Sequence, residues 1–222
     1  MPATACLAPS KSPPQAGRVR LRNQASLLRA AERVFARAGF AGATVADIAA
    51  EAGMPKGNLH YYYRTKRDLY RAVLTNILSL WLSETDGIVA AADPRAALEH
   101  YIRAKMRFSR EFPEASRVFA NELLHGANEI GEFLATDLRA LVRARARVMR
   151  GWIAAGRMAP QDPVHLFFAI WATTQTYADF AAQINAVTGV TSLSDKQYAA
   201  ATESVVAMFL RATGLASPMP GP

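Results

Sequence analysis

The chain of 222 residues contains only one cysteine, Cys6, and four histidines that are scattered along the sequence. A single cysteine excludes an intrachain disulfide and a metal site built from cysteines, and the histidines show no metal-ligand spacing. The sequence also has no Gly-rich phosphate loop, no paired catalytic acids and no nucleophile beside a base. We therefore expect no metal, no cofactor and no enzymatic activity.

Long hydrophobic runs are missing as well. Apolar residues make up 51% of the chain and charged residues 20%, but no uninterrupted apolar run approaches the roughly 20 residues that span a bilayer. Residues 1–20 are rich in Pro, Ala and Ser and lack the apolar centre of a secretory signal. These absences predict a soluble, cytoplasmic protein with no membrane partner.

Charge is distributed unevenly along the chain. Residues 1–70 carry eleven Lys or Arg against four Asp or Glu, a net charge of +7, whereas residues 71–222 carry fifteen against fourteen, a net charge of +1. A local positive field suits a polyanion, because each phosphate that is neutralised releases counterions. Basic termini also often serve only solubility, so charge alone leaves both interpretations open.

The order of polar, apolar and turn-forming residues predicts an all-α fold of about nine helices, with no alternating strand pattern. Residues 1–20 hold four prolines and are predicted to be a disordered leader that ends in a basic arm at Arg18, Arg20 and Arg22. We expect a helix-turn-helix domain over residues 21–68, a helical body over residues 69–215 and a disordered tail over residues 216–222.

Cap and breaker residues between positions 23 and 80 predict four consecutive helices. Thr44 with Asp47 and Thr65 with Asp68 resemble capping boxes, and Gly53 separates two short helices. The predicted elements are an amphipathic helix from Asn23 to Gly39, a short helix from Val45 to Ala52, a short helix from about Pro55 to Tyr62, and a longer helix from Thr65 through Leu80.

Two short helices joined by a glycine-containing turn form the unit that lays its second helix in the major groove of DNA. Val45, Ile48 and Ala49 are expected to face a small core, and Tyr63 to pack into it. The outer side of the second helix is then free for DNA. We expect base contacts from Lys56, Asn58 and His60, and phosphate contacts from Thr44, Tyr61, Tyr62 and Lys66.

The body offers a candidate ligand site. A helix from Asp162 to about Val187 carries Trp171, Gln175 and Asp179 at spacings of four, and Trp81 near the end of the fourth helix adds another large ring. Indole faces suit flat rings, and a carboxamide complements an amide edge, so a small planar heterocycle would fit. A Trp on an apolar helix face is also commonly ordinary core.

The segment Asn23–Leu74, with its string TVADIAAEAGMPKGNLHYYYRTKRDLY, resembles the DNA-binding domain of TetR-family repressors. The resemblance implies a three-helix head, a connecting fourth helix, and an effector-binding body that forms a homodimer through its last two helices. It also implies DNA-facing positions at Thr44, Lys56, Gly57, Asn58, Tyr61, Tyr62 and Lys66. Tyr63 stands where the family often has Phe, and His60 where Tyr is common.

The body segments FSREFPEASRVFANELLHGA and FFAIWATTQTYADFAAQINAV resemble the RutR-type regulators of pyrimidine utilisation within that family. This resemblance implies an effector such as uracil or thymine, with ligand contacts at Trp81, Trp171 and Gln175. Helical position adds Phe108, Tyr177 and Asp179 as further candidates.

The function that we expect is a ligand-responsive repressor that binds a palindromic double-stranded DNA operator. The alternatives are a TetR-like regulator of efflux or lipid metabolism with a lipophilic effector, an architectural DNA-binding protein without an effector, and an enzyme fused to a DNA-binding head.

Overall fold

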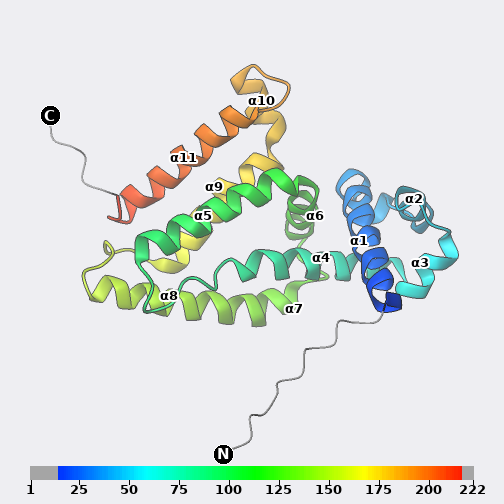
Figure 1. The fold of residues 1–222 in the computed structure, drawn as a ribbon, viewed down its shortest axis with the longest axis horizontal. Coiled ribbons are helices and arrows are strands. Elements are labelled where there is room, and N and C mark those ends of the chain that lie inside the picture. Colours follow the sequence, from blue (N-terminus) through cyan, green and yellow to red (C-terminus); the bar gives the residue numbers. More distant parts are fainter. Residues whose placement is uncertain (1–14, 217–222) are drawn as a thin grey trace, which may run out of the picture.

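The computed structural model describes residues 15–216, and all regular structure in this part of the chain is helical, which confirms the all-α prediction. Figure 1 shows the arrangement. The elements are α1 (Gln15–Gly42), α2 (Val45–Glu51), α3 (Lys56–Tyr62), α4 (Lys66–Ser83), α5 (Pro94–Glu111), α6 (Pro113–Leu124), α7 (Gly131–Phe133), a π-helical turn (Leu134–Leu138), α8 (Arg139–Ala154), α9 (Pro163–Asp179), α10 (Ala181–Thr188) and α11 (Asp195–Ala212).

The predicted caps of the N-terminal helices are present. The Thr44 hydroxyl accepts a hydrogen bond from the Asp47 backbone N–H at 3.1 Å, and Thr65 with Asp68 forms a reciprocal capping box at the start of α4. Gly53 adopts φ +63° between α2 and α3, a conformation that favours glycine over residues with a Cβ. These local interactions fix the short helices at the predicted positions.

Two helix boundaries differ from the prediction. α1 begins at Gln15 rather than near Asn23, so residues 15–20, expected to be disordered, are helical; Ala16, Arg18 and Arg20 are good helix formers there. The predicted helix from Asp162 to Val187 is divided at Phe180, whose φ of −115° and ψ of 30° are not helical. No Gly or Pro marks this break. Residues 1–14 and 217–222, predicted to be disordered, lie outside the described residues.

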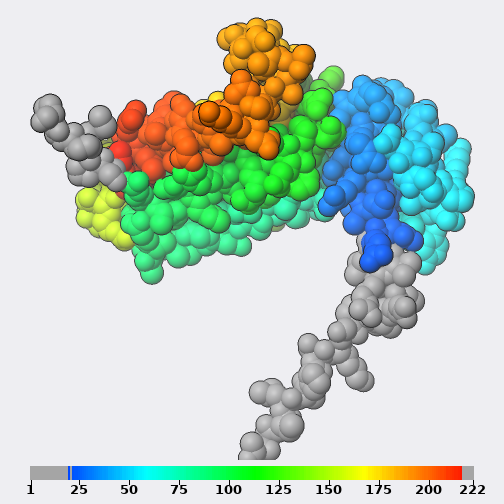
Figure 2. All heavy atoms as spheres, turned by 45° about the horizontal axis from the view of Figure 1, so that its top comes forward, coloured from blue at the N-terminus to red at the C-terminus, as the bar shows by residue number. Residues whose placement is uncertain are grey.

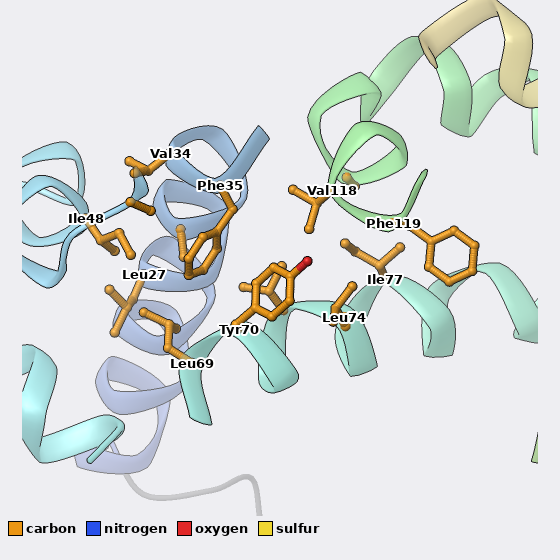
Figure 3. Packing of buried hydrophobic residues seen from close by; sticks show 14 of the residues in the cluster. Leu27, Val34, Phe35, Ile48, Leu69, Tyr70, Leu74, Ile77, Val118 and Phe119 are labelled. Atoms are coloured by element: carbon orange, nitrogen blue, oxygen red, sulfur yellow. The ribbon is translucent and has the colours of Figure 1, made fainter. Parts of the chain in front are cut away.

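The buried side chains form two hydrophobic cores. The first core joins α1, α2, α3, α4 and α6; in Figure 3, Tyr70, Leu74 and Ile77 of α4 lie between Phe35 of α1 and the α6 residues Val118 and Phe119. The second core joins α5, α8, α9 and α11. The three-helix head, α1–α3, is therefore packed directly on α4 and α6 rather than joined to the body by a free linker.

The head lies at one end of the elongated molecule, and the body, α4–α11, extends away from it (Figures 1 and 2). α10 projects from the body between α9 and α11. Among the described residues, no helix is both long and apolar enough to cross a membrane.

Candidate functional site

The first candidate surface is the outer side of α3. Lys56, Gly57, Asn58 and His60 are exposed, and Tyr61 is 70% exposed although it is an aromatic residue. Leu59, on the opposite side of the helix, is completely buried in the first core. The packing of α3 through Leu59 therefore leaves its polar side open, as a recognition helix requires.

The other predicted phosphate contacts flank α3. Tyr62 is half-buried, and its ring lies edge-on to that of Tyr61, with 5.3 Å between the ring centroids. Thr44 is exposed at the N-terminus of α2 and also donates a hydrogen bond to the Asp47 carboxylate at 2.7 Å. Tyr63 packs against the first core, as predicted, and its hydroxyl accepts a hydrogen bond from Gln24 at 3.1 Å.

Lys66 differs from the other predicted DNA contacts because its ammonium group is used within the protein. Its Nζ donates to the carbonyl oxygens of Phe40 at 2.7 Å and Ala43 at 2.9 Å, and lies 4.7 Å from the centroid of the Phe40 ring. These bonds tie the start of α4 to the segment between α1 and α2. A phosphate contact from Lys66 would have to replace or share them.

The second candidate site is a cavity of about 200 Å³ between the two cores, here called the inter-core cavity. It contains three of the predicted ligand residues: Trp81 from α4, and Trp171 and Gln175 from α9. The other residues that line it are Leu78, Leu82, Thr85, Tyr101, Lys105, Phe119, Leu123, Leu134, Leu138 and Leu141. The walls are mainly leucine and aromatic side chains, with a few polar groups among them.

Several polar groups of this cavity are hydrogen-bond donors. Trp81 is buried, and its indole Nε1–H has no hydrogen-bond partner among the described residues. The Trp171 indole instead donates to the Tyr101 hydroxyl at 2.6 Å. Gln175 contributes a carboxamide, which both donates and accepts. A buried N–H without a partner costs free energy, so a ligand acceptor at Trp81 would be favourable.

Lys105 is a charged residue of the cavity wall that the sequence prediction missed. It is 3% exposed, and its Nζ lies 4.0 Å from the centroid of the Trp81 ring. Burial lowers the pKa of Lys105 to about 7, and the negative charge of Asp179 acts in the opposite direction. Lys105 follows Leu98 and Tyr101 on the buried side of α5, and this lysine within an apolar stripe was the signal available in the sequence.

Three predicted ligand residues do not line the inter-core cavity. Phe108 is buried in the first core, and Tyr177 packs against the ring of Tyr198 at a centroid distance of 5.7 Å. Asp179 is half-buried, and burial raises the pKa of its carboxyl group. Its negative charge affects the cavity only indirectly, because it raises the pKa of Lys105. The helical-position argument for these residues is therefore not supported.

A polar network connects the head side of α4 with α6, and we call it the α4–α6 network. The Tyr70 hydroxyl donates to the Glu122 carboxylate at 3.0 Å, and this carboxylate also accepts the Glu129 backbone N–H at 2.7 Å. The Glu129 side chain forms ion pairs with Arg67 at 3.1 Å and Arg71 at 2.7 Å. Glu122 lies next to Leu123 of the cavity wall, so the network joins that wall to α4.

Comparisons with known proteins agree with this geometry. Residues 27–73 match the family model described as bacterial regulatory proteins, tetR family, and residues 74–216 match that of the YcdC-like protein, C-terminal region. The chain is 45% identical to the HTH-type transcriptional regulator RutR of Escherichia coli over 166 aligned residues. This alignment covers 75% of this chain and 78% of RutR. It is 28% identical over 137 residues to the transcriptional repressor NicS of Pseudomonas putida, covering 61% of this chain and 64% of NicS.

Solved structures share the fold at low sequence identity. A transcriptional regulator from Streptomyces coelicolor matches with a TM-score of 0.68 at 22% identity, over 89% of this chain and 99% of that protein. The ketosteroid transcriptional regulator KstR2 of Mycobacterium tuberculosis matches with a TM-score of 0.68 at 18% identity, over 86% and 94% of the two chains. The chain belongs to the TetR family of bacterial transcriptional regulators, and it is not an enzyme.

Proposed function

We propose that this regulator is a repressor that binds a palindromic DNA operator as a homodimer through α3 and responds to a small planar pyrimidine, uracil or thymine, in the inter-core cavity. The observation that carries this proposal is that Trp81, Trp171 and Gln175 line one cavity. A regulator that reads chromosomal DNA works in the cytoplasm, which is the location that we propose.

The size of the cavity favours a small effector. Sites for drug-sized ligands commonly measure about 300–1,000 Å³, whereas the inter-core cavity measures about 200 Å³. A single pyrimidine ring suits this volume better than a steroid or a long acyl chain. The 45% identity to RutR supports the same choice, because the resemblance to RutR-type regulators of pyrimidine utilisation implies such an effector.

The donor pattern also favours a pyrimidine. Uracil and thymine present two carbonyl oxygens and two N–H groups around a flat ring. The unpaired Trp81 N–H and the Lys105 ammonium can donate to carbonyl oxygens, and the Gln175 carboxamide can pair with an adjacent carbonyl and N–H edge. The indole ring of Trp171 supplies a flat apolar wall.

The many leucines of the cavity support the alternative, a regulator of efflux or lipid metabolism with a lipophilic effector. Leu78, Leu82, Leu123, Leu134, Leu138 and Leu141 line the cavity. A lipophilic ligand, however, would leave the Trp81 N–H without a partner and would contact the buried Lys105, both of which cost binding free energy. We therefore favour the pyrimidine.

The outer side of α9 supports the homodimer. Phe168 is 50% exposed, Ala169 and Ala172 are also exposed, and Met208 on α11 is 48% exposed. An uncharged strip with a large exposed ring is typical of a surface that a partner covers. Two copies joined there would present two α3 helices to half-sites about one turn of DNA apart, ~34 Å.

The test measures DNA binding and effector binding by the same purified protein. A duplex selected by the protein from a random library is titrated by fluorescence anisotropy, first alone and then with uracil, thymine or a medium-chain fatty acid. We expect either pyrimidine, and not the fatty acid, to release the duplex. Gln175→Leu should retain DNA binding but weaken pyrimidine binding in calorimetry by about tenfold or more.

Two results would count against the proposal. Release by the fatty acid alone would favour the lipophilic alternative. Full DNA binding at millimolar uracil and thymine, with no heat of binding, would exclude these effectors, and a monomer without sequence preference would exclude the whole assignment.

A further inference from the structure

The N-terminal part of α1 extends beyond the three-helix head that the sequence predicts. Because α1 begins at Gln15, Arg20 and Arg22 are part of a helix that continues into the head core at Leu27. We infer that this extension is a second DNA-binding element, in which Arg20 and Arg22 contact backbone phosphates beside the half-site that α3 reads. The inference rests on the proposed DNA-binding function of α3.

Two side-chain contacts hold the extension against α3. The guanidinium carbon of Arg20 lies 5.7 Å from the centroid of the Tyr61 ring, and Gln24 donates a hydrogen bond to the Tyr63 hydroxyl at 3.1 Å. Tyr61 is itself exposed on the surface proposed to face DNA. Arg20 is thus already placed beside this surface, so less conformational entropy is lost when a phosphate binds.

An open groove joins the extension to α3. Asn23 and Ser26 of α1 line one side, and Asn58, Tyr61 and the turn at Gly53 line the other. Arg20, Asn23 and Ser26 follow one another at spacings of three, which places them along one strip of the helix, and Arg22 precedes Ser26 by one turn. The groove is therefore edged by polar residues of α1, and both arginines lie within about one or two turns of them on the same helix.

The positive charge of the extension is uncompensated. No acidic residue precedes Glu32 in the sequence, and among the described residues Arg20 and Arg22 are exposed and form no ion pair. Three other cations of the head region are already engaged: Arg33 and Arg37 pair with Glu51, and Lys66 donates to carbonyl oxygens.

Phosphate is the group that this chemistry recognises best. Exposed guanidinium groups with free N–H donors bind phosphate oxygens, and such contacts hold a protein on the duplex without reading its sequence. The extension lies next to α3. A DNA duplex bound by α3 would therefore bring its phosphates close to Arg20 and Arg22.

The test compares two matched double variants of the full chain. Arg20→Gln with Arg22→Gln removes the two charges that the inference invokes. Arg143→Gln with Arg147→Gln removes two exposed charges from α8 in the body, which form no ion pair within the described part of the chain. DNA affinity is measured by fluorescence anisotropy from about 50 to 200 mM salt, on the selected duplex and on a scrambled one. Circular dichroism and uracil binding report whether each variant is folded.

For a dimer, the first variant removes four phosphate contacts, so we expect the slope of log affinity against log salt to fall by roughly three to four units. Affinity for the selected and scrambled duplexes should fall by the same factor, and the α8 variant should retain the wild-type slope. Methylphosphonate linkages beside the half-sites should weaken wild-type binding but leave the Arg20→Gln, Arg22→Gln variant unaffected.

An unchanged salt slope in the folded Arg20→Gln, Arg22→Gln variant would overturn the inference while leaving α3 as the DNA reader. A loss of affinity confined to the selected duplex would also overturn it, because phosphate contacts do not distinguish sequences. Failure of the wild-type protein to bind any duplex would instead reject the proposed function.

Discussion

The two hydrophobic cores differ in what they hold together. The first core fixes the DNA-reading head to α4 and α6, whereas the second packs α5 and α8 with α9 and α11, the helices with the uncharged outer strip. The inter-core cavity draws Trp81 and Phe119 from the first core and Tyr101 and Trp171 from the second. A ligand there would contact both cores at once, so it can change how the head is held relative to the body.

The largest expected effect comes from creating a cavity in either core. Phe35 in the first core and Phe167 in the second are both buried, and Phe→Ala at such sites costs about 3–5 kcal/mol of unfolding free energy. Because Phe167 lies 5.8 Å from the Tyr101 ring and 5.9 Å from the Trp171 ring, Phe167→Ala should also weaken effector binding. Phe35→Ala should not.

Urea unfolding followed by circular dichroism, with calorimetric titration of effector below the transition, measures both quantities. We expect one cooperative transition in each variant, because α4 and α6 carry the first core up to the wall of the cavity. Two separate transitions in either variant would mean that the cores fold independently.

The buried lysine at the junction of the cores predicts a pH dependence. Burial holds the pKa of Lys105 at about 7 in the folded protein, whereas in the unfolded chain it lies near 10.4. Between these values the unfolded state binds more protons, so stability rises with pH by up to about 1.4 kcal/mol per unit. Below pH 7 both states are protonated and the full cost of the buried charge remains; above about pH 10.4 both are neutral and the cost disappears.

Lys105→Met should remove this rise when urea unfolding is measured from pH 7 to 9.5. Asp179→Asn is the informative companion, because it removes the charge that raises the lysine pKa, and the rise should then begin at a lower pH. Identical pH profiles for wild type and Lys105→Met would show that the lysine is solvated in the folded protein.

Lys66 and Lys56, the first residues of α4 and α3, form a second informative pair. Lys66→Met removes hydrogen bonds from a charged donor to carbonyl oxygens of the head, so we expect a loss of about 2 kcal/mol of unfolding free energy. Lys56 is exposed, so Lys56→Met should weaken DNA binding and leave stability nearly unchanged. Normal stability of Lys66→Met with a smaller salt slope would instead restore the predicted phosphate contact.

Local chemistry explains which parts of the fold the sequence predicts. Thr44 and Thr65 cap helices through bonds to residues three positions later, so their effect is readable from spacing alone. The break at Phe180 has no such local signal, and the prediction therefore joined α9 and α10. The early start of α1 was obscured by the prolines of residues 1–20, all of which precede Gln15.

In the candidate ligand site, too, the sequence predicts what depends on local spacing and misses what depends on tertiary packing. Trp171 and Gln175 are four residues apart and so share a face of α9, but Asp179 is eight residues from Trp171, and the rotation of about 100° per residue turns it some 80° away. Lys105 was missed because lysines are rarely buried without a partner. Only the packing of α5 against α4 and α9 reveals that this one lies in the cavity.

The smallest effect that we predict concerns communication between the cores. In the α4–α6 network, Glu129 holds Arg67 and Arg71 of α4, and its backbone N–H donates to Glu122 beside the cavity wall. An effector that displaces α6 would therefore pull on the half of α4 next to the head. Both arginines are more than half exposed, so water screens the pairs and limits their contribution to about 1 kcal/mol or less.

We define the effector response as the DNA affinity without effector divided by the DNA affinity with effector. Glu129→Gln should reduce this ratio by about threefold to fivefold, whereas the affinity for effector in the absence of DNA should stay at the wild-type value. Glu114→Gln is a suitable control, because within residues 15–216 the Glu114 side chain forms an ion pair only with Arg117 on its own helix. Tyr70→Phe combined with Glu129→Gln tests the shared route: if both act through Glu122, their effects on the ratio are not additive. If the ratio of DNA affinities is unchanged in Glu129→Gln and in the double variant, the cavity communicates with the head through the apolar contact of Trp81 and Phe119 alone.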